Sequence, residues 1–205
     1  MKNIYKYGFW VLLLLSLLLY NILLITKEGY NKDIEKVKVI NEKRIASLLL
    51  SNSIINRHIN SIQGENIITG KKFDNLFQNA SLVILLSTFK CDKCQENELK
   101  KLNSLNEIFK LKRQDINIIG ITTKSKADIV IRERKIAKIN FPIYWIDDNS
   151  FYNKIAFNKE FPQILLIVNN IIVSGFTPIP KDNKFSDNYY KYILTKNISA
   201  LRGNN

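Results

Sequence analysis

SLVILLSTFKCDKCQE, residues 81–96, joins a short apolar run to the only two cysteines of the 205-residue chain. The run from Ser81 to Leu86 is of the kind expected for a strand buried on both faces. After Cys94 the sequence becomes amphipathic with a helical period. Cys91 and Cys94 are three residues apart, so a helix that opens at Cys91 brings both sulfurs to one face, where they can bond to each other. The stretch predicts a strand that delivers a CxxC pair to a helix N-terminus.

This position has a chemical consequence for the first cysteine. The unpaired N–H groups and the positive end of a helix stabilise a thiolate at Cys91, and the thiolate is the species that attacks a disulfide. The flanking charges tune the same equilibrium: Lys90 and Lys93 favour the thiolate, whereas Asp92 opposes it. The residues therefore favour a redox function.

Other roles for two cysteines are a structural disulfide, haem attachment and metal binding. A three-residue loop constrains the unfolded chain little, so stabilisation is a poor reason for a CxxC. Gln95 stands where haem attachment requires a histidine. His58 is the only histidine, so cysteine and histidine alone cannot complete a four-ligand zinc site. We expect no metal and no other cofactor.

The chain is strongly basic, with 31 Lys and Arg against 18 Asp and Glu and a formal net charge of +13. The lysines are spread along the chain, and no motif of a nucleic-acid module occurs. We expect no nucleic-acid partner and interpret the charge as a solvated surface that favours anionic lipid headgroups.

Residues 8–25, GFWVLLLLSLLLYNILLI, contain no charge over 18 residues, which is about 27 Å of helix and close to the thickness of a bilayer core. A cleaved signal peptide is the alternative, because Lys2 and Lys6 form a basic N-terminal region. The apolar stretch is longer than a usual signal core, and TKEG at 26–29 has no small-x-small cleavage site. We predict a membrane anchor over residues 1–27.

The basic residues before the span favour a cytoplasmic N-terminus, and a short tail before a long domain usually leaves that domain translocated. We therefore expect a single-pass protein of the cell inner (cytoplasmic) membrane. Its C-terminal domain would face the periplasm or extracytoplasmic side.

Residues 28–61 predict a membrane-proximal helical stalk, because no proline or glycine interrupts the chain between Asn31 and Ile62. Apolar residues recur there at roughly helical spacing: Ile34, Val37, Ile45, Leu48, Leu49 and Ile55. The heptads are irregular. Packing on the domain and a homodimer contact through this helix remain open.

Residues 62–205 predict an α/β domain in which strands and helices alternate and a hairpin and a helix follow. We expect strands or hairpins at 65–77, 81–86, 115–121, 143–146, 163–168 and 171–173, and helices after Cys91, over 125–139 and over 189–201. The inward residues of the first two helices are predicted to be Leu99, Leu102, Leu105, Ile108, Phe109, Ile129, Ile136 and Ile139. The order implies a central mixed sheet covered on both faces.

This order, with a CxxC after the first central strand and Phe161-Pro162 just before the strand of the hairpin, resembles the thioredoxin-like fold. More narrowly, residues 62–200 resemble the membrane-anchored thiol-disulfide oxidoreductases of the TlpA type in the AhpC/TSA redoxin group. The matching motifs are the strand 82–86, Cys91-Asp92-Lys93-Cys94, Glu98-Leu99 with Leu102, residues 118–121, Phe141-Pro142 with Asp147, and Phe161-Pro162.

By this resemblance Cys91 is the attacking cysteine, Cys94 the resolving cysteine, and Pro162 a cis-proline that faces the disulfide. The backbone of Phe161 would then pair with an extended substrate. From the residues alone, Pro162 is a trans proline at a strand entrance. The resemblance also implies protein dithiol or disulfide substrates, an upstream thiol electron donor, and reduction of exported protein disulfides.

The sequence departs from the family at several motif positions. Lys90 replaces a tryptophan, Asp92-Lys93 replaces a pair that often includes proline, and Gln163 follows Pro162 where small or hydroxylated residues are common.

Two other functions remain open. One is a thiol peroxidase, for which Thr88 fits the usual loop while Ile84 stands in place of its proline. The other is a non-catalytic, membrane-tethered binding module.

Overall fold

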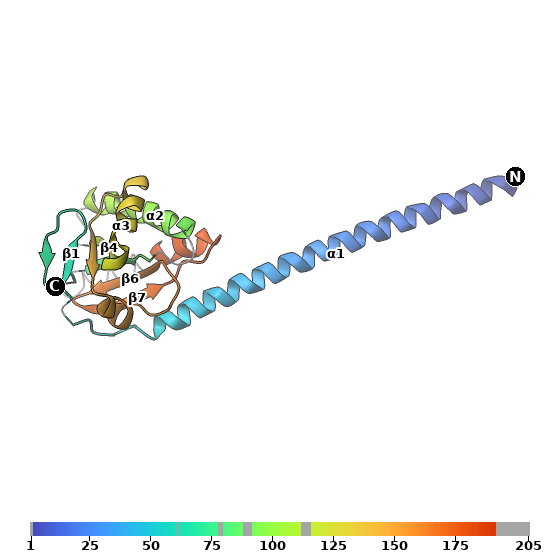
Figure 1. Ribbon diagram of the computed structural model, residues 1–205. Helices are drawn as coiled ribbons and strands as arrows, with labels where there is room; N and C mark the ends of the chain where they lie inside the picture. The colour runs from blue at the N-terminus through green and yellow to red at the C-terminus, as the bar shows by residue number, and fades with distance from the viewer. Residues whose placement is uncertain (1, 61, 78–79, 88–91, 112–115, 192–205) are drawn as a thin grey trace. The chain divides into compact units, whose positions relative to one another are not determined.

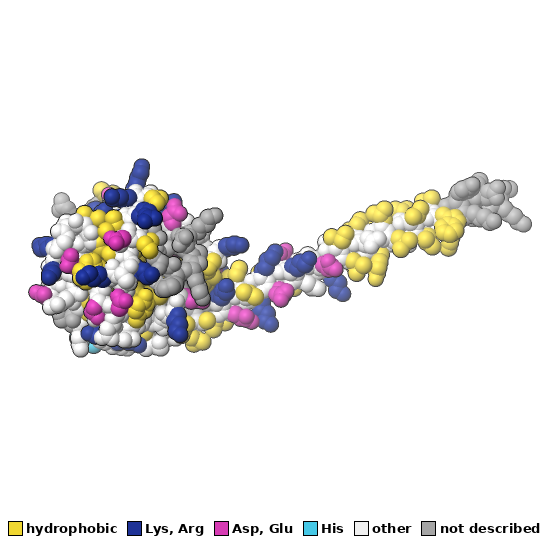
Figure 2. Space-filling view, in the orientation of Figure 1, with side chains coloured by type: hydrophobic (Ala, Val, Ile, Leu, Met, Phe, Trp, Pro, Cys, Tyr) yellow, Lys and Arg dark blue, Asp and Glu magenta, His cyan; other side chains and the backbone are white. Residues whose placement is uncertain are grey.

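The computed structural model describes residues 2–60, 62–77, 80–87, 92–111 and 116–191, and the chain divides into two compact units, Met1–Lys43 and Arg44–Asn205. The first unit is a single α-helix, the N-terminal part of α1 (Lys2–Asn52). The large apolar side chains between Phe9 and Ile25 are exposed on it, and charged side chains follow them along the helix (Figure 2). No glycine or proline lies between Phe9 and Ile25, so nothing there interrupts the helical hydrogen bonding of the apolar stretch.

In the described part of the chain, one helix is long and apolar enough to cross a membrane, on length and composition alone. The apolar stretch of α1 is that segment, and it lies near the N-terminus, where a signal sequence has the same character. The helix is thus compatible with the predicted anchor.

The second unit is built on a seven-stranded mixed sheet in the order β2-β1-β5-β4-β3-β6-β7 (Figure 1). Its strands are β1 (Gly64–Asn66), β2 (Lys72–Phe73), β3 (Ala80–Leu85), β4 (Ile116–Thr123), β5 (Ile143–Ile146), β6 (Gln163–Val168) and β7 (Ile171–Phe176). β3 pairs parallel with β4 and antiparallel with β6, and β6 and β7 form a hairpin through Asn169-Asn170, both at positive φ. The predicted mixed sheet is confirmed.

The side chains of β3 alternate between two apolar cores, one on each face of the sheet. Leu82 and Ile84 pack with residues of α2 (Asp92–Leu111) and α3 (Ala127–Ile136), together with Tyr189 and Tyr190. Val83 and Leu85 lie in the second core, whose other members include Ile54, Phe77, Phe151 and Phe161. Every residue of β3 is buried, which explains why the strand reads as a continuous apolar run rather than an alternating one.

The last turns of α1 belong to the second unit. Ser47 and Ser51 are buried there, and Ile54 and Ile59 enter the core beneath the sheet. Ser47 Oγ donates to the carbonyl of Thr177 at 3.1 Å and accepts its N–H at 2.9 Å. The compact unit therefore takes in residues 44–61, which the sequence analysis assigned to the stalk.

Two helix faces differ from the prediction. Ile108 is 42% exposed, Ile129 38% and Ile136 70%, whereas Val130 is buried. α3 is shorter than the predicted 125–139, and Ile139 is buried beyond its end. Apolar side chains lie on more than one side of both helices, so helical spacing alone does not identify the side that packs on the sheet.

The last described helix covers residues 183–191, so it begins six residues before the predicted start at 189; residues 192–201 of that prediction lie outside the described residues. Asp182 precedes the helix, and its Oδ1 accepts the N–H of Phe185 at 3.3 Å, as an N-cap does. The same carboxylate is held by Arg44, through Nε at 2.6 Å and Nη2 at 3.0 Å. The cap is a non-local contact, which periodicity cannot reveal.

Asp182 is expected to make the stability of the folded unit pH-dependent. The hydrogen bond and charge of Arg44 hold the pKa of Asp182 below its usual range. The folded state then binds fewer protons, so this contribution is present above the unfolded pKa of about 4 and is lost as pH falls through the lower folded pKa. Asp182→Asn keeps a capping acceptor but loses the charge, and its stability should depend less on pH in this acidic range. Asp182→Ala also loses the cap, at a cost of about 1 kcal/mol.

Urea unfolding from about pH 6 down to about pH 3 measures the effect. The exposed Asp148, changed to Asn, is the control. A pH slope in Asp182→Asn as steep as in the unchanged protein would refute the assignment.

Candidate functional site

The two motifs that the sequence singled out adjoin the carboxyl end of β3 in the chain or in the sheet: the CxxC follows β3, and Phe161-Pro162 precedes β6, which pairs with β3. The chain leaves β3 after Leu85 and re-enters regular structure at Asp92, where α2 begins. Cys94 therefore lies in the first turn of α2, as expected for a CxxC at a helix N-terminus. Cys91 and Lys90 lie outside the described residues, and for Asp92, Lys93 and Cys94 the structure describes the backbone alone.

Buried polar side chains fix the end of β3 and tie it to the first turn of α2. Gln95 Oε1 accepts the backbone N–H of Ser87 at 3.3 Å, so the first turn of α2 is tied to the end of the strand. Thr122, fully buried on β4, donates to the carbonyl of Leu86 at 3.3 Å. Among the described residues, the buried hydroxyl of Ser87 has no hydrogen-bond partner. In the sequence, Gln95 only excluded haem attachment. In the fold it also has a structural role at this site.

Pro162 is preceded by a cis peptide bond, the geometry that the resemblance implies and that the residues alone did not favour. Directly after it, Gln163 opens β6 and pairs with Leu85 of β3 in the antiparallel register. The register therefore places the Phe161–Pro162 bond beside the point where the chain leaves β3 toward Cys91. The substrate-binding role predicted for Phe161 and Pro162 stays a prediction.

An aromatic group packs against the ring of Phe161. Phe151 stacks on it with ring centroids 5.6 Å apart and an interplanar angle of 21°, and Tyr152 meets it edge-on at 6.3 Å. Both come from the π-helical segment η2 (Ser150–Ile155), in which Ala156 N–H donates to the carbonyl of Phe151. Phe161 is 7% exposed, so its side chain is part of the core.

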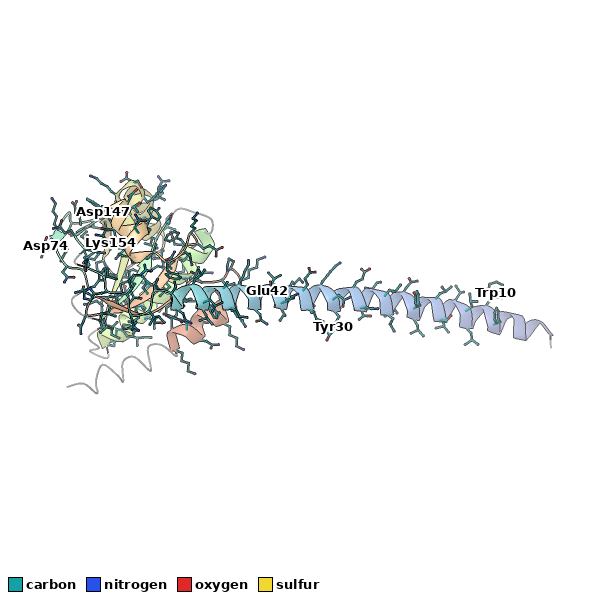
Figure 3. All side chains as sticks on the ribbon, turned by 90° about the horizontal axis from the view of Figure 1, so that it is seen from below. Trp10, Tyr30, Glu42, Asp74, Asp147 and Lys154 are labelled. Carbon is teal, nitrogen blue, oxygen red and sulfur yellow. The ribbon has the colours of Figure 1, made fainter. Side chains whose placement is uncertain are left out.

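Asp147 lies three residues before this segment. Its Oδ1 accepts the N–H of Ser150 at 2.8 Å. Hydrogen bonds from Ser150, with a smaller contribution from the charge of Lys154, hold the pKa of Asp147 below its usual range; the two charged residues lie close together (Figure 3). Asp147 thus caps the segment that carries Phe151.

One carboxylate is buried on the same helix as the CxxC. Glu98 lies one turn after Cys94 and is 2% exposed. It accepts a hydrogen bond from the hydroxyl of Tyr190 at 2.6 Å and forms an ion pair with Lys101 at 3.3 Å. Burial, and next the charge of Glu98, raise the pKa of Tyr190, so this hydroxyl keeps its proton and donates it. Glu98 has the partners that a buried charge requires.

The sequence analysis missed the polar residues that hold these loops. Asn158 precedes the cis bond and Gln163 follows it, and the side chain of Gln163 is hydrogen-bonded to Asn158. Neither residue was assigned a role from the sequence. The departure at position 163 from the family's small or hydroxylated residues was the available signal. The role of Gln163 depends on hydrogen-bond partners that come together only in the folded loop.

No family model and no curated protein matches the sequence. Solved structures do match. They include an uncharacterized thioredoxin-like protein from Porphyromonas gingivalis, with 16% identity, 72% of this chain and 93% of that chain covered, and a TM-score of 0.51. A putative protein disulfide isomerase from Bacteroides thetaiotaomicron has 13% identity, coverages of 68% and 87%, and a TM-score of 0.54. A putative thiol:disulfide interchange protein DsbE from Chlorobium tepidum has 11% identity, coverages of 69% and 96%, and a TM-score of 0.54. The second unit therefore has the thioredoxin-like fold.

Proposed function

We propose that this thioredoxin-fold protein is a thiol-disulfide oxidoreductase that exchanges disulfides through Cys91 and Cys94. The observation that carries the proposal is the placement of the cis Phe161–Pro162 bond beside the end of β3 that leads to the CxxC. The start of α2 at Asp92 adds a helix N-terminus, which favours a thiolate. The structural neighbours described as thiol:disulfide interchange proteins support the same chemistry.

In the proposed reaction the Cys91 thiolate attacks one sulfur of a substrate disulfide, the S–S bond breaks, and the released thiolate takes up a proton. A mixed disulfide joins Cys91 to the substrate. The Cys94 thiolate then attacks the Cys91 sulfur and releases the second substrate thiol. Two electrons pass from the dithiol to the substrate, and the Cys91–Cys94 disulfide is left for an upstream thiol donor to reduce.

The apolar part of α1 supports membrane attachment of this domain. The exposed side chains from Phe9 to Ile25 suit a hydrocarbon environment rather than water. The basic residues at the start of α1 favour a cytoplasmic N-terminus. We therefore place the domain on the periplasmic or extracytoplasmic side, where its substrates are exported proteins with disulfides. A homodimer contact through the helix after the span is part of the proposal, since Ile45, Leu48 and Leu49 are exposed.

Equilibration with glutathione tests the function. We expect the reduced protein to form a single intramolecular disulfide between Cys91 and Cys94 at a defined ratio of reduced to oxidised glutathione, detected by thiol alkylation and mass spectrometry. The ratio at half-oxidation distinguishes a reductant from an oxidant. A pair that forms only mixed disulfides with glutathione, and never the internal one, would contradict the proposal. The double variant Cys91→Ser, Cys94→Ser is the control for labelling.

A further inference from the structure

Gln163, which follows the cis bond directly, is completely buried and bonded through both ends of its amide. Its Nε2 donates to the carbonyls of Asn158 and Glu160, each at 2.9 Å. Its Oε1 accepts the N–H of Phe157 at 3.0 Å. One fully buried side chain thus hydrogen-bonds three backbone groups of the loop that leads into Phe161–Pro162.

Asn158 extends this contact to the rest of the fold. Its Oδ1 accepts the N–H of Glu160 at 2.7 Å, and its Nδ2 donates to the hydroxyl of Thr177 at 2.7 Å. The backbone of Thr177 is in turn bonded on both sides to Ser47 of α1. The loop 157–160 is therefore fixed to residues beyond β7 and on α1, far from it in sequence.

The two sides of the cis bond are held by different forces. On one side Phe161 is packed by its stacking on Phe151, and on the other Gln163 is held by hydrogen bonds and by its place opposite Leu85 in the sheet. A backbone segment that is already held in one conformation loses less conformational entropy when an extended peptide pairs with it. A small disulfide that makes no strand-like pairing gains little from such order.

We propose that Gln163, with Asn158, is a positioning residue that holds the Phe161–Pro162 backbone for pairing with extended, disulfide-bearing peptides. This inference rests on the proposed function and adds to it the two residues that hold the Phe161–Pro162 backbone, with an effect expected on polypeptide substrates rather than on small disulfides. Gln163 acts through the loop and touches no reacting sulfur.

The test compares two probes on Gln163→Leu, which keeps most of the side-chain volume but removes every hydrogen bond of the amide. The probes are a pair of short extended peptides joined by one disulfide, and glutathione disulfide. We expect kcat/KM for the peptide probe to fall about tenfold or more, mainly through KM, while the rate with glutathione disulfide changes by less than about twofold. Gln63→Leu is the matched control, because Gln63 is exposed and bonded only weakly, at 3.4 Å, to Asp74.

An equal loss on both probes, or an unchanged KM for the peptide, would overturn the positioning role. If Gln163→Leu does not fold, Asn158→Ala replaces it, since that variant keeps the bonds from Gln163 to Glu160 and Phe157; a peptide KM equal to that of the unchanged protein would then refute the inference. Failure of the unchanged protein to exchange with either probe would instead refute the proposed function, and with it this inference.

Discussion

Cys94→Ser is expected to accumulate mixed disulfides between Cys91 and the protein's substrates, because the second thiolate that releases them is missing. Cys91→Ser is expected to form none, and its exchange rate should fall to that of the protein-free reaction. This expected difference follows from the proposed roles of the two cysteines: in the sequence Cys91 immediately precedes α2, whereas Cys94 is within its first turn. This is the largest effect on activity that the arrangement predicts.

The trapped species are measured in cells that express each variant, by non-reducing electrophoresis after acid quenching and alkylation. Mass spectrometry then identifies the bond to Cys91. The double serine variant is the control for noncovalent association. If that double variant retained full activity in the cell, the chain would be a binding module with dispensable cysteines, and the oxidoreductase proposal would fail.

Phe151→Ala is expected to lower the free energy of unfolding by about 3–5 kcal/mol, since a buried aromatic ring is lost and a cavity remains. Phe151 is completely buried in the core on one face of the sheet and stacks on Phe161. Domains are stable by only about 5–15 kcal/mol, so this is a large share of the total. The loss also removes the packing that holds Phe161 beside the site.

Urea unfolding followed by circular dichroism measures the change, with Tyr152→Ala as the matched control. Tyr152 is the next residue in the same π-helical segment but is 40% exposed, so its truncation should cost clearly less. Equal losses in the two variants would show that the aromatic group does not pack as described.

Local patterns were enough to predict most of the sheet. The strands at 143–146 and 163–168 have the predicted limits, because each is a short apolar run bounded by proline or turn residues. The faces of the helices were predicted less well. Val130 rather than Ile129 is buried, since the sheet, not the helix, determines which of two adjacent apolar residues points inward. The segment η2 was not predicted.

From local patterns alone one can predict the strands and main helices, their order, the apolar character of α1 and the position of the CxxC before an amphipathic helix. These features depend on residues close together in the chain, whose periodicity and turn chemistry are local. The tertiary structure decided that Arg44 begins the compact unit, that the bond before Pro162 is cis, and that Gln163 and Asn158 hold the loop beside it. Each of these depends on contacts between segments far apart in the chain: Arg44 with Asp182, Leu85 with Gln163, and Asn158 with Thr177.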